Sequence, residues 1–473
     1  MKHQQTPEEK FDMMTKTPVQ KLIGRLAVPT IISMLITSIY NMADTFFLGQ
    51  LGKMSATTGD PSGSAVTTGA VGVCLALMAI IQAVGFTLGM GSGNYISRLL
   101  GHKEAQKAEQ VASTGFLTAI ICGGVITVLG LLFLDPLVRI LGATDTILPH
   151  AKAYAGFILL GAPYMAAAFV LNNLLRFQGS AFYSMLGLGT GGLLNILLDP
   201  LFIFVFRLGT AGAAIATIIS QFVSFLILFS FNGRNGNIKV SLRNFTPKWA
   251  IYKEILRGGL PSFYRQGLAS IATISLNWCA NPFGDVAISA MTIVSRIFQF
   301  ALSALLGFGQ GFQPVCGFNY GAQRYDRVMR AYWFCIKVAC FGLIGVGALG
   351  FLFAPQIVSI FVGNTPDVIA IGSRALRFQC ITFPLSGWIT INNMLLQTIG
   401  KGTKASILAL ARQGLFFLPL VFCLSAFLGL IGVQVAQPVA DVCTFMLAVP
   451  MGISVVRELR EMQRTAEIRT NDQ

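Results

Sequence analysis

The sequence predicts an all-α polytopic membrane protein, and three observations support this fold class. Only 11% of the 473 residues are charged and 54% are hydrophobic, whereas an ordinary soluble domain carries roughly 25% charged residues. The mean hydropathy is +0.68, and the apolar residues gather in twelve long runs. This composition excludes a soluble enzyme, a disulfide-stapled secreted module and a disordered chain, because it could not keep their surfaces wetted.

Twelve predicted spans follow one another along the chain. Each is a run of about 20 or more mostly apolar residues, the length at which a helix crosses a bilayer core of about 30 Å. The spans cover approximately residues 22–50, 66–97, 108–134, 153–175, 183–206, 210–231, 258–281, 286–318, 328–353, 375–399, 404–427 and 430–456. Residues 1–21 contain no apolar core of a signal peptide, so the first span is expected to direct membrane targeting.

The distribution of Lys and Arg indicates the orientation of the spans. Basic residues collect in cytoplasmic loops, and a cytoplasmic N-terminus leaves 24 of them on that side and 6 on the other. Both termini are therefore predicted to be cytoplasmic. The expected domains are an N-terminal tail (1–21), a six-helix lobe (22–231), a basic cytoplasmic linker (232–257), a second six-helix lobe (258–456) and a cytoplasmic C-terminal tail (457–473).

Other functional classes are disfavoured by the residue patterns. The net charge of +15 does not indicate nucleic-acid binding, because the basic residues punctuate apolar runs instead of forming a patch with aromatic residues. The nine Cys contain no C-x-x-C and are interpreted as small buried hydrophobes. No P-loop and no H-E-x-x-H occurs, so we expect neither ATP hydrolysis nor a structural metal.

The two halves of the chain resemble each other at a shift of about 220 residues, which indicates an internal repeat. The matches pair Gly89, Gly91 and Gly101 with Gly309, Gly311 and Gly321, then Gly209, Gly212 and Ala216 with Gly429, Gly432 and Ala436, and, at a shift of 221, Pro163, Asn172 and Gly179 with Pro384, Asn393 and Gly400. Each copy holds an even number of spans, six, so the repeats are parallel. Transporters built from repeats place their substrate between the copies.

Acidic residues inside the first-half spans are candidates for ion coupling. A charge costs roughly 2.5–3.5 kcal/mol at a helix centre, and its default interpretation is functional. Asp44 with Asn41, and Asp199 with Asn195, lie three or four residues apart, so each pair shares a helix face. Burial favours the protonated form of a carboxyl group, and the amides could instead help to hold a Na⁺. Alternatively each Asp caps a broken helix or pairs with an Arg, and Pro200 supports that interpretation for Asp199.

Charged residues also lie inside the second-half spans. Asp441 is in the last span, and Arg265, Arg296 and Arg412 are in the seventh, eighth and eleventh. Two interpretations are open for the three Arg. They either neutralise Asp441 or line the substrate cavity.

Three motifs resemble the MATE (multidrug and toxic compound extrusion) family. Pro29 followed by Asp44-Thr-Phe-Phe-Leu-Gly-Gln-Leu-Gly52 is similar to that family's first helix. The run Gly309-Gln-Gly-Phe-Gln-Pro-Val-Cys-Gly-Phe-Asn-Tyr-Gly-Ala322 is similar to its eighth-helix motif. Pro261-Ser-Phe-Tyr-Arg265-Gln266-Gly resembles the seventh helix of its MepA-like bacterial branch. The resemblance covers about residues 15–456.

The resemblance implies two six-helix lobes that form a V around a cavity open alternately to either side. It implies a secondary antiporter that exports lipophilic, often cationic drugs in exchange for H⁺ or Na⁺. It also implies a bacterial inner membrane protein among membrane lipids, not an enzyme, with no cofactor and no nucleic-acid partner. We expect it to function as a monomer.

Site residues carry over from the family motif by motif. Asp44, Asn195 and Asp199 match the first-lobe cation site, where Na⁺ could bind, and Thr217 matches its sixth-helix ligand. The sodium-coupled NorM branch has acids on the seventh and tenth helices, where this chain has Arg265 with Gln266 and Asn392 with Asn393. Coupling is therefore expected in the first lobe, with H⁺ favoured over Na⁺. The candidate substrate-cavity residues are Arg265, Gln266, Asn392 and Asn393 together with Arg296, Arg412 and Asp441.

Two rival functions follow from the same residues. A lipid-linked oligosaccharide flippase of the same superfamily would have a more basic cavity for pyrophosphate, which Arg265, Arg296 and Arg412 would suit, although the first-lobe carboxylates argue against it. A polytopic lipid-linked transferase would need a polar catalytic constellation in an interfacial loop, and the outer loops here are short.

Overall fold

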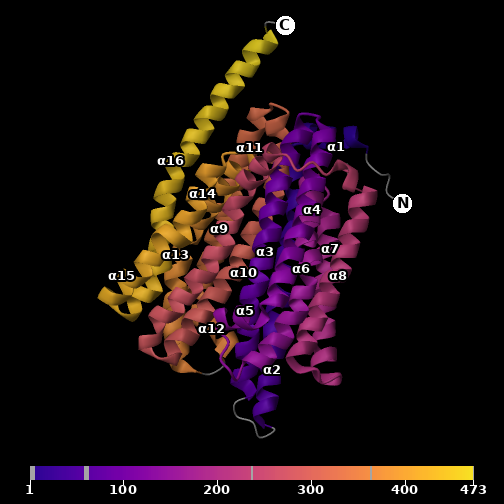
Figure 1. Ribbon diagram of the computed structural model, residues 1–473. Coiled ribbons are helices and arrows are strands. Elements are labelled where there is room, and N and C mark those ends of the chain that lie inside the picture. Colours follow the sequence, from indigo (N-terminus) through magenta and orange to yellow (C-terminus); the bar gives the residue numbers. More distant parts are fainter. Residues whose placement is uncertain (1–5, 58–62, 236–237, 363–364, 472–473) are drawn as a thin grey trace. The chain divides into compact units, whose positions relative to one another are not determined.

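The computed structural model describes residues 6–57, 63–235, 238–362 and 365–471 (Figure 1). Within these ranges the regular secondary structure is helical, with no strand. The prediction of an all-α polytopic membrane protein is confirmed. The observed helices also overlap the predicted spans closely. An apolar run long enough to cross the bilayer core marks a span in the sequence, and the same run forms a helix in the structure.

The first half of the chain forms six long helices. They are α2 (Val19–Thr57), α3 (Gly63–Gly101), α4 (Ala105–Leu132), α6 (Leu148–Phe177), α7 (Ala181–Pro200) and α8 (Gly209–Asn235). Three shorter elements accompany them, namely α1 (Pro7–Lys16), α5 (Leu134–Ile140) and the π-helical segment η1 (Leu201–Val205), which continues α7.

The second half repeats this series. Its long helices are α9 (Trp249–Ala280), α10 (Asp285–Gly321), α11 (Tyr325–Leu352), α13 (Pro366–Thr398), the run formed by α14 (Gly402–Leu410), η4 (Ala411–Phe417) and α15 (Leu418–Leu428), and α16 (Leu430–Asn471). The short elements are η2 (Leu242–Asn244), η3 (Asn281–Phe283) and α12 (Ala354–Val362). Most of the predicted C-terminal tail is a helical continuation of α16, the long yellow helix in Figure 1.

Ten helical runs of the described chain are long and apolar enough to cross a membrane. The other two long helices, α9 and α13, occupy the seventh and tenth predicted spans. Polar side chains such as Arg265 and Gln379 lower their hydropathy, and both of these residues line an internal pocket. Their polar character therefore reflects a protein environment instead of lipid.

The fourth span of each half forms the centre of its core. In the first half α6 contacts α3, α4, α5, α7 and α8, and in the second half α13 contacts α10, α11, α12, α14 and α16. The two helices match at a shift of 221 through Pro163 with Pro384. Each is therefore covered by its neighbours over most of its surface, although Leu160 of α6 and Ile381 of α13 are exposed.

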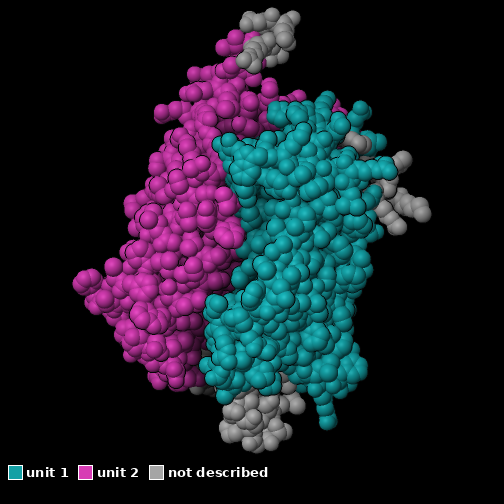
Figure 2. All heavy atoms as spheres, in the orientation of Figure 1, with its two compact units in different colours: residues 1–8, 32–259 teal, residues 9–31, 260–473 magenta. Residues whose placement is uncertain are grey.

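By its contacts the chain divides into two compact units, coloured separately in Figure 2. Unit 1 comprises residues 1–8 and 32–259, and unit 2 comprises residues 9–31 and 260–473. The first turns of α2 therefore belong to unit 2, and those of α9 to unit 1. Most of each unit is one copy of the repeat.

The turns of the two halves have matching backbone conformations. Lys103 and Gln323, 220 residues apart, both have positive φ, of 62° and 58°. Asn172 Nδ2 donates to the carbonyl oxygen of Ser184 at 3.3 Å. At a shift of 221, Asn393 Nδ2 donates to the carbonyl oxygen of Ala405 at 2.7 Å. The internal repeat predicted from the sequence is thus present at the level of single hydrogen bonds.

Glycines allow the exchanged first turns of α2 to pack closely in unit 2. A methyl group on Gly311 of α10 would lie 2.5 Å from Ala27 Cα, and one on Gly307 would lie 2.6 Å from Ile31 Cα. These distances are well below the 3.5–4.0 Å of ordinary carbon contacts, roughly the optimum for attraction. Only glycine permits the two backbones to approach this closely, as in other small-residue helix crossings.

The reciprocal contact occurs in unit 1, between α3 and the first turns of α9. A methyl group on Gly91 would overlap the carbonyl oxygen of Ile255, and the backbone of Gly259 meets that of Thr87. Gly91 and Gly311 are equivalent positions of the repeat. Each unit therefore includes the start of a helix whose remainder belongs to the other unit.

The basic segment before α9 is docked on α4 within unit 1. The Ser241 amide donates to Ser113 Oγ at 3.1 Å, and the Thr246 amide donates to Thr114 Oγ1 at 3.2 Å. Asn244 Nδ2 donates to Glu109 Oε2 at 3.1 Å. These hydrogen bonds hold residues 239–246 on one helix of the unit.

Candidate functional site

A buried polar cluster lies between α7 and α8 in unit 1. Asn195 and Asp199 are one turn apart on α7, and their exposed fractions are 3% and 0%. Asn195 Nδ2 donates to Asp199 Oδ1 at 3.3 Å and is 3.4 Å from Thr217 Oγ1 on α8. The structure thus brings together three of the five residues predicted for ion coupling.

The side-chain oxygens of Thr217 and Asn195 differ in the hydrogen bonds that they already make. Thr217 Oγ1 donates to the carbonyl oxygen of Ala213 at 3.0 Å, so its lone pairs point to the cluster. Asn195 Oδ1 is buried and accepts no hydrogen bond from any described residue. An amide oxygen and a hydroxyl oxygen beside a carboxylate are the donor set that a hard cation such as Na⁺ prefers, and they also suit a carboxyl group that gains a proton.

The helix changes its winding directly after Asp199. Pro200 has no N–H, and η1 follows it with the wider i to i+5 bonding of a π-helix, seen in the Phe206 amide donating to the Leu201 oxygen at 3.0 Å. Such π-helical turns occur often at functional sites. The carboxylate of Asp199 is thus attached to a helix whose next turn is already irregular.

The remaining two residues of the predicted coupling set lie on α2. Asn41 is exposed in the structure. The side chain of Asp44 lies outside the residues whose side chains the structure describes. The membership of Asp44 and Asn41 in the coupling set therefore stays a prediction.

A second polar cluster lies in unit 2 and is centred on Asp441 of α16, which is fully buried. Arg412 Nε donates to Asp441 Oδ1 at 2.9 Å, and Arg412 Nη2 donates to Ser386 Oγ at 3.0 Å. Gln437 Nε2 and Gln379 Nε2 donate to the two carboxylate oxygens at 3.0 and 3.3 Å. Arg412 is therefore ion-paired with Asp441, and it also lines a pocket.

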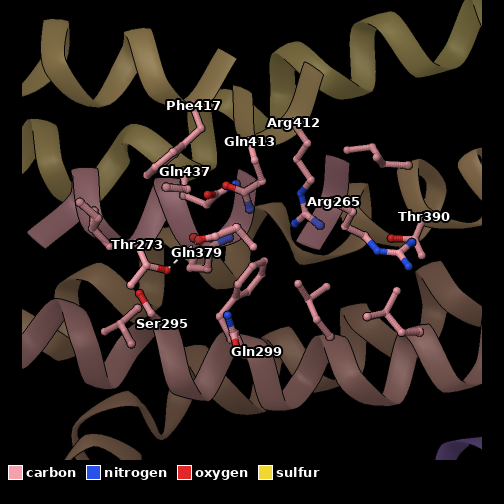
Figure 3. A pocket seen from close by; sticks show the side chains of 18 of the residues that line it. Arg265, Thr273, Ser295, Gln299, Gln379, Thr390, Arg412, Gln413, Phe417 and Gln437 are labelled. Atoms are coloured by element: carbon pink, nitrogen blue, oxygen red, sulfur yellow. Dashed lines mark hydrogen bonds between the residues drawn. The ribbon is translucent and has the colours of Figure 1, made fainter. Parts of the chain in front are cut away.

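A pocket of about 310 Å³ opens beside this ion pair (Figure 3). Residues from α9, α10, α13, α14, η4 and α16 line it. Arg265 and Arg412 both reach into it, and Arg412 also lies over the Phe298 ring at 5.4 Å. The pocket is wholly within unit 2. Its size is near the lower end of the range of small-molecule sites, about 300–1,000 Å³.

The other predicted cavity residues have different positions. Gln266 and Asn393 line the pocket. Arg296 on α10 is exposed and does not line it. Asn392 is fully buried and donates from Nδ2 to the carbonyl oxygen of Ala448 at 2.7 Å. Asn392 therefore ties α13 to α16, whereas its neighbour Asn393 points to the pocket.

Several pocket residues were not predicted from the sequence. The amides of Gln379, Gln413 and Gln437 and the rings of Phe298 and Phe417 all line it. Amides inside apolar spans are a usable signal, because an uncharged polar group in a membrane also needs a partner. The aromatic residues carry no such signal, since Phe is abundant throughout this chain.

Comparisons with known proteins give consistent findings. A family model described as MatE matches residues 29–201 and 261–423. Multidrug export protein MepA of Staphylococcus aureus is 29% identical over 432 residues, covering 90% of this chain and 92% of that protein. MepA of Staphylococcus haemolyticus is 26% identical over 442 residues, covering 93% and 94%. A multidrug resistance MATE family transporter of the MOP superfamily, solved in an outward-facing conformation, is similar with a TM-score of 0.87 and 28% identity, covering 96% and 99%.

Proposed function

Because this chain belongs to the MatE family, a family of multi-pass membrane efflux transporters, we propose that it is a secondary antiporter. It exports lipophilic, often cationic compounds by alternating access, in exchange for H⁺, with Na⁺ as the alternative coupling ion. The name multidrug export protein, given to its staphylococcal relatives, supports export of drugs as the activity of this chain.

The observation that carries the proposal is the buried contact of Asn195, Asp199 and Thr217 between two helices. A carboxyl group that takes up a proton becomes a hydrogen-bond donor as well as an acceptor. Protonation of Asp199 therefore changes which partners it can bind on α7 and α8. In this proposal that exchange of partners, assisted by Asp44, rearranges the first lobe and displaces substrate.

The same cluster supports Na⁺ as the alternative ion. Na⁺ would be held by oxygens of Asp199, Asn195 and Thr217, with Asp44 and Asn41 completing the set from α2. In either case the coupling charge resides on the carboxylates of the first half. Moving one elementary charge through 100 mV supplies about 2.3 kcal/mol, or roughly a 50-fold concentration gradient when the exported compound is neutral. A one-for-one exchange of H⁺ for a monovalent cation moves no net charge and gains nothing from the voltage, so its driving force is the pH gradient.

The proposed setting follows from the family and the charge distribution. The protein is a bacterial inner membrane transporter with both termini in the cytoplasm, where most of its loop Lys and Arg lie. It acts as a monomer among membrane lipids and needs no cofactor. The two lobes move against one another, with residues 232–257 as the cytoplasmic link between them.

The test is efflux of ethidium, a fluorescent lipophilic cation, from proteoliposomes with an imposed pH gradient. Wild type is compared with Asp199→Asn and with Asp367→Asn, which removes the same charge from an exposed position at the start of α13. We expect efflux to be lost in Asp199→Asn and retained in Asp367→Asn.

Each other outcome changes a stated part of the proposal. Equal efflux in wild type and Asp199→Asn excludes Asp199 as the coupling residue. Efflux that needs a Na⁺ gradient instead of a pH gradient assigns Na⁺ as the coupling ion. Absence of wild-type efflux under either gradient refutes antiport of lipophilic cations.

A further inference from the structure

Among the described residues that line this pocket, one cation has no acid paired with it. Two charged residues line it, Arg265 and Arg412. Arg412 is paired with Asp441, whereas Arg265 has no hydrogen bond or ion pair with any residue of the described chain. The pocket therefore presents one net positive charge to whatever occupies it.

An uncompensated guanidinium inside a membrane protein is costly. A charge at the centre of a membrane helix costs roughly 2.5–3.5 kcal/mol, and such residues pair with one another or mark a substrate path. Arg265 and the ion-paired Arg412 both reach into the same pocket (Figure 3), so their like charges raise the cost further. A negatively charged ligand would remove this cost.

The rest of the pocket fits an apolar body with few polar groups. Phe298 and Phe417 supply aromatic surface, together with Leu276, Met291 and Leu306. Gln413 contributes a buried amide oxygen that accepts no hydrogen bond from the described residues. A guanidinium, an unused amide and an apolar wall are the features that recognise an amphipathic molecule with an acid group at one end.

We propose that this pocket binds amphipathic organic monoanions, with the acid group on Arg265 and the apolar body against Phe298 and Phe417. The inference deepens the proposed function, on which it rests only in taking the bound molecule to be a substrate for export. A single free guanidinium matches a single acid group, whereas a pyrophosphate carries at least two negative charges and needs more cations. Lipophilic cations are repelled by Arg265 and bind outside this pocket.

Two probes that differ only in charge test the assignment. Dansylglycine carries a carboxylate, and dansylglycinamide is its neutral counterpart of nearly the same shape. Binding of each to the purified full-length protein in nanodiscs of phosphatidylcholine is followed by dansyl fluorescence anisotropy. The variants are Arg265→Gln, Arg265→Lys and the matched control Arg296→Gln, which removes an exposed positive charge of the same unit.

We expect wild type to prefer dansylglycine and Arg265→Gln to bind it about 10- to 100-fold more weakly, the effect of losing one charge-assisted hydrogen bond. The neutral probe changes by less than about 3-fold. Arg265→Lys keeps part of the preference, and Arg296→Gln keeps all of it. Arg265→Gln also binds ethidium more tightly than wild type does.

The proposal is overturned if Arg265→Gln weakens both probes equally, if it weakens neither, or if Arg296→Gln has the same effect. Dansylglycine binding is measured at equilibrium without an ion gradient, so it does not depend on ion-coupled transport. Failure of gradient-driven efflux with this binding intact refutes the proposed function and leaves the anion site standing.

A second arm separates a free amphiphile from an anionic lipid as the natural occupant. Part of the phosphatidylcholine is replaced by phosphatidylglycerol. Weaker dansylglycine binding to wild type, with no change in the residual binding to Arg265→Gln, assigns the site to the lipid headgroup. Unchanged binding assigns it to soluble amphiphiles, and both results support an anion on Arg265.

Discussion

A single methyl group at Gly311 is expected to destabilise unit 2, because α10 and the start of α2 touch there through their backbones. In Gly311→Ala the new carbon would lie 2.5 Å from Ala27 Cα and 2.6 Å from Ala27 N. Carbon atoms at optimal separation are about 3.5–4.0 Å apart. The two helices must therefore separate by about 1 Å, and no side-chain rotation can relieve the overlap.

The free energy of unfolding is expected to fall by about 1–3 kcal/mol, the typical effect of an overpacking substitution. For a unit of this size, that loss lowers the midpoint of thermal unfolding by about 2–10 °C. The assay is thermal unfolding of the purified protein in a non-ionic detergent, followed by the monomer fraction in size-exclusion chromatography. The matched control is Gly345→Ala on α11, where an added methyl group meets no atom within 4 Å.

Gly345→Ala is expected to leave the midpoint unchanged or to raise it slightly, since Ala favours the helix over Gly. The reasoning would be refuted by equal midpoints for Gly311→Ala and Gly345→Ala. Such a result would mean that the start of α2 does not pack on α10 as described.

Three further predictions concern stability. Arg412→Gln leaves the buried Asp441 carboxylate without its cation and is expected to lower the free energy of unfolding by about 3–5 kcal/mol. Most of this loss should be recovered in the double variant Arg412→Gln/Asp441→Asn. A double-mutant cycle of thermal unfolding midpoints checks this, and a double variant no more stable than Arg412→Gln contradicts it. Asn393→Leu removes the hydrogen bond to the Ala405 oxygen and should cost about 1–3 kcal/mol, whereas a melting curve like that of wild type would assign this bond no structural role. Burial lowers the pKa of Lys10, in α1 outside the spans, to about 8 from 10.5, so its burial opposes folding below pH 8 and ceases to do so as the pH rises towards 10.5. Lys10→Met should therefore raise stability by up to about 3 kcal/mol at pH 7 and little at pH 10.5, and an equal gain at both pH values would rule out the charge as the cause.

The sequence predicted the helices well because a membrane span has a length and a composition of its own. It also predicted the repeat, since glycines such as Gly91 and Gly311 mark close backbone approaches that no other residue allows. It did not predict that the first turns of α2 and α9 pack in the opposite unit. Hydropathy reports that a residue is apolar, and it does not report which helix covers it.

The candidate site in the first half was predicted more fully than the pocket of the second half. Asn195 and Asp199 are one turn apart on one helix, so helical spacing alone fixes their common face. Arg265, Arg296 and Arg412 lie on three different helices, and which of them reaches Asp441 depends on the rotation of each helix. The irregular turns of η4, which contain Arg412, alter that rotation and have no signature in the sequence.

Some predictions stay predictions. The V-shaped arrangement of the lobes, the domain boundaries and the coupling roles of Asp44 and Asn41 are examples. Arg176 shows a different limit of the sequence. It directly follows the fourth predicted span, 153–175, and the structure buries it to 1% exposure at the end of α6, where Arg176 Nη2 donates to Met90 Sδ at 3.0 Å. From the sequence, a charged residue at the end of an apolar run is interpreted as a loop residue, whereas in the structure α6 continues through Arg176.

The exchange of first turns between units has a consequence for biosynthesis. Ala27 is translated 284 residues before Gly311, so at about 5–20 residues per second the start of α2 waits roughly 15–60 s for its partner. During that interval the stretch of α10 that covers it in the finished protein is absent. Thr30, the polar residue nearest the crossing, already donates its hydroxyl to the carbonyl oxygens of Leu26 and Ala27, both at 2.9 Å. The nascent helix is therefore internally satisfied while it remains unpaired in the bilayer.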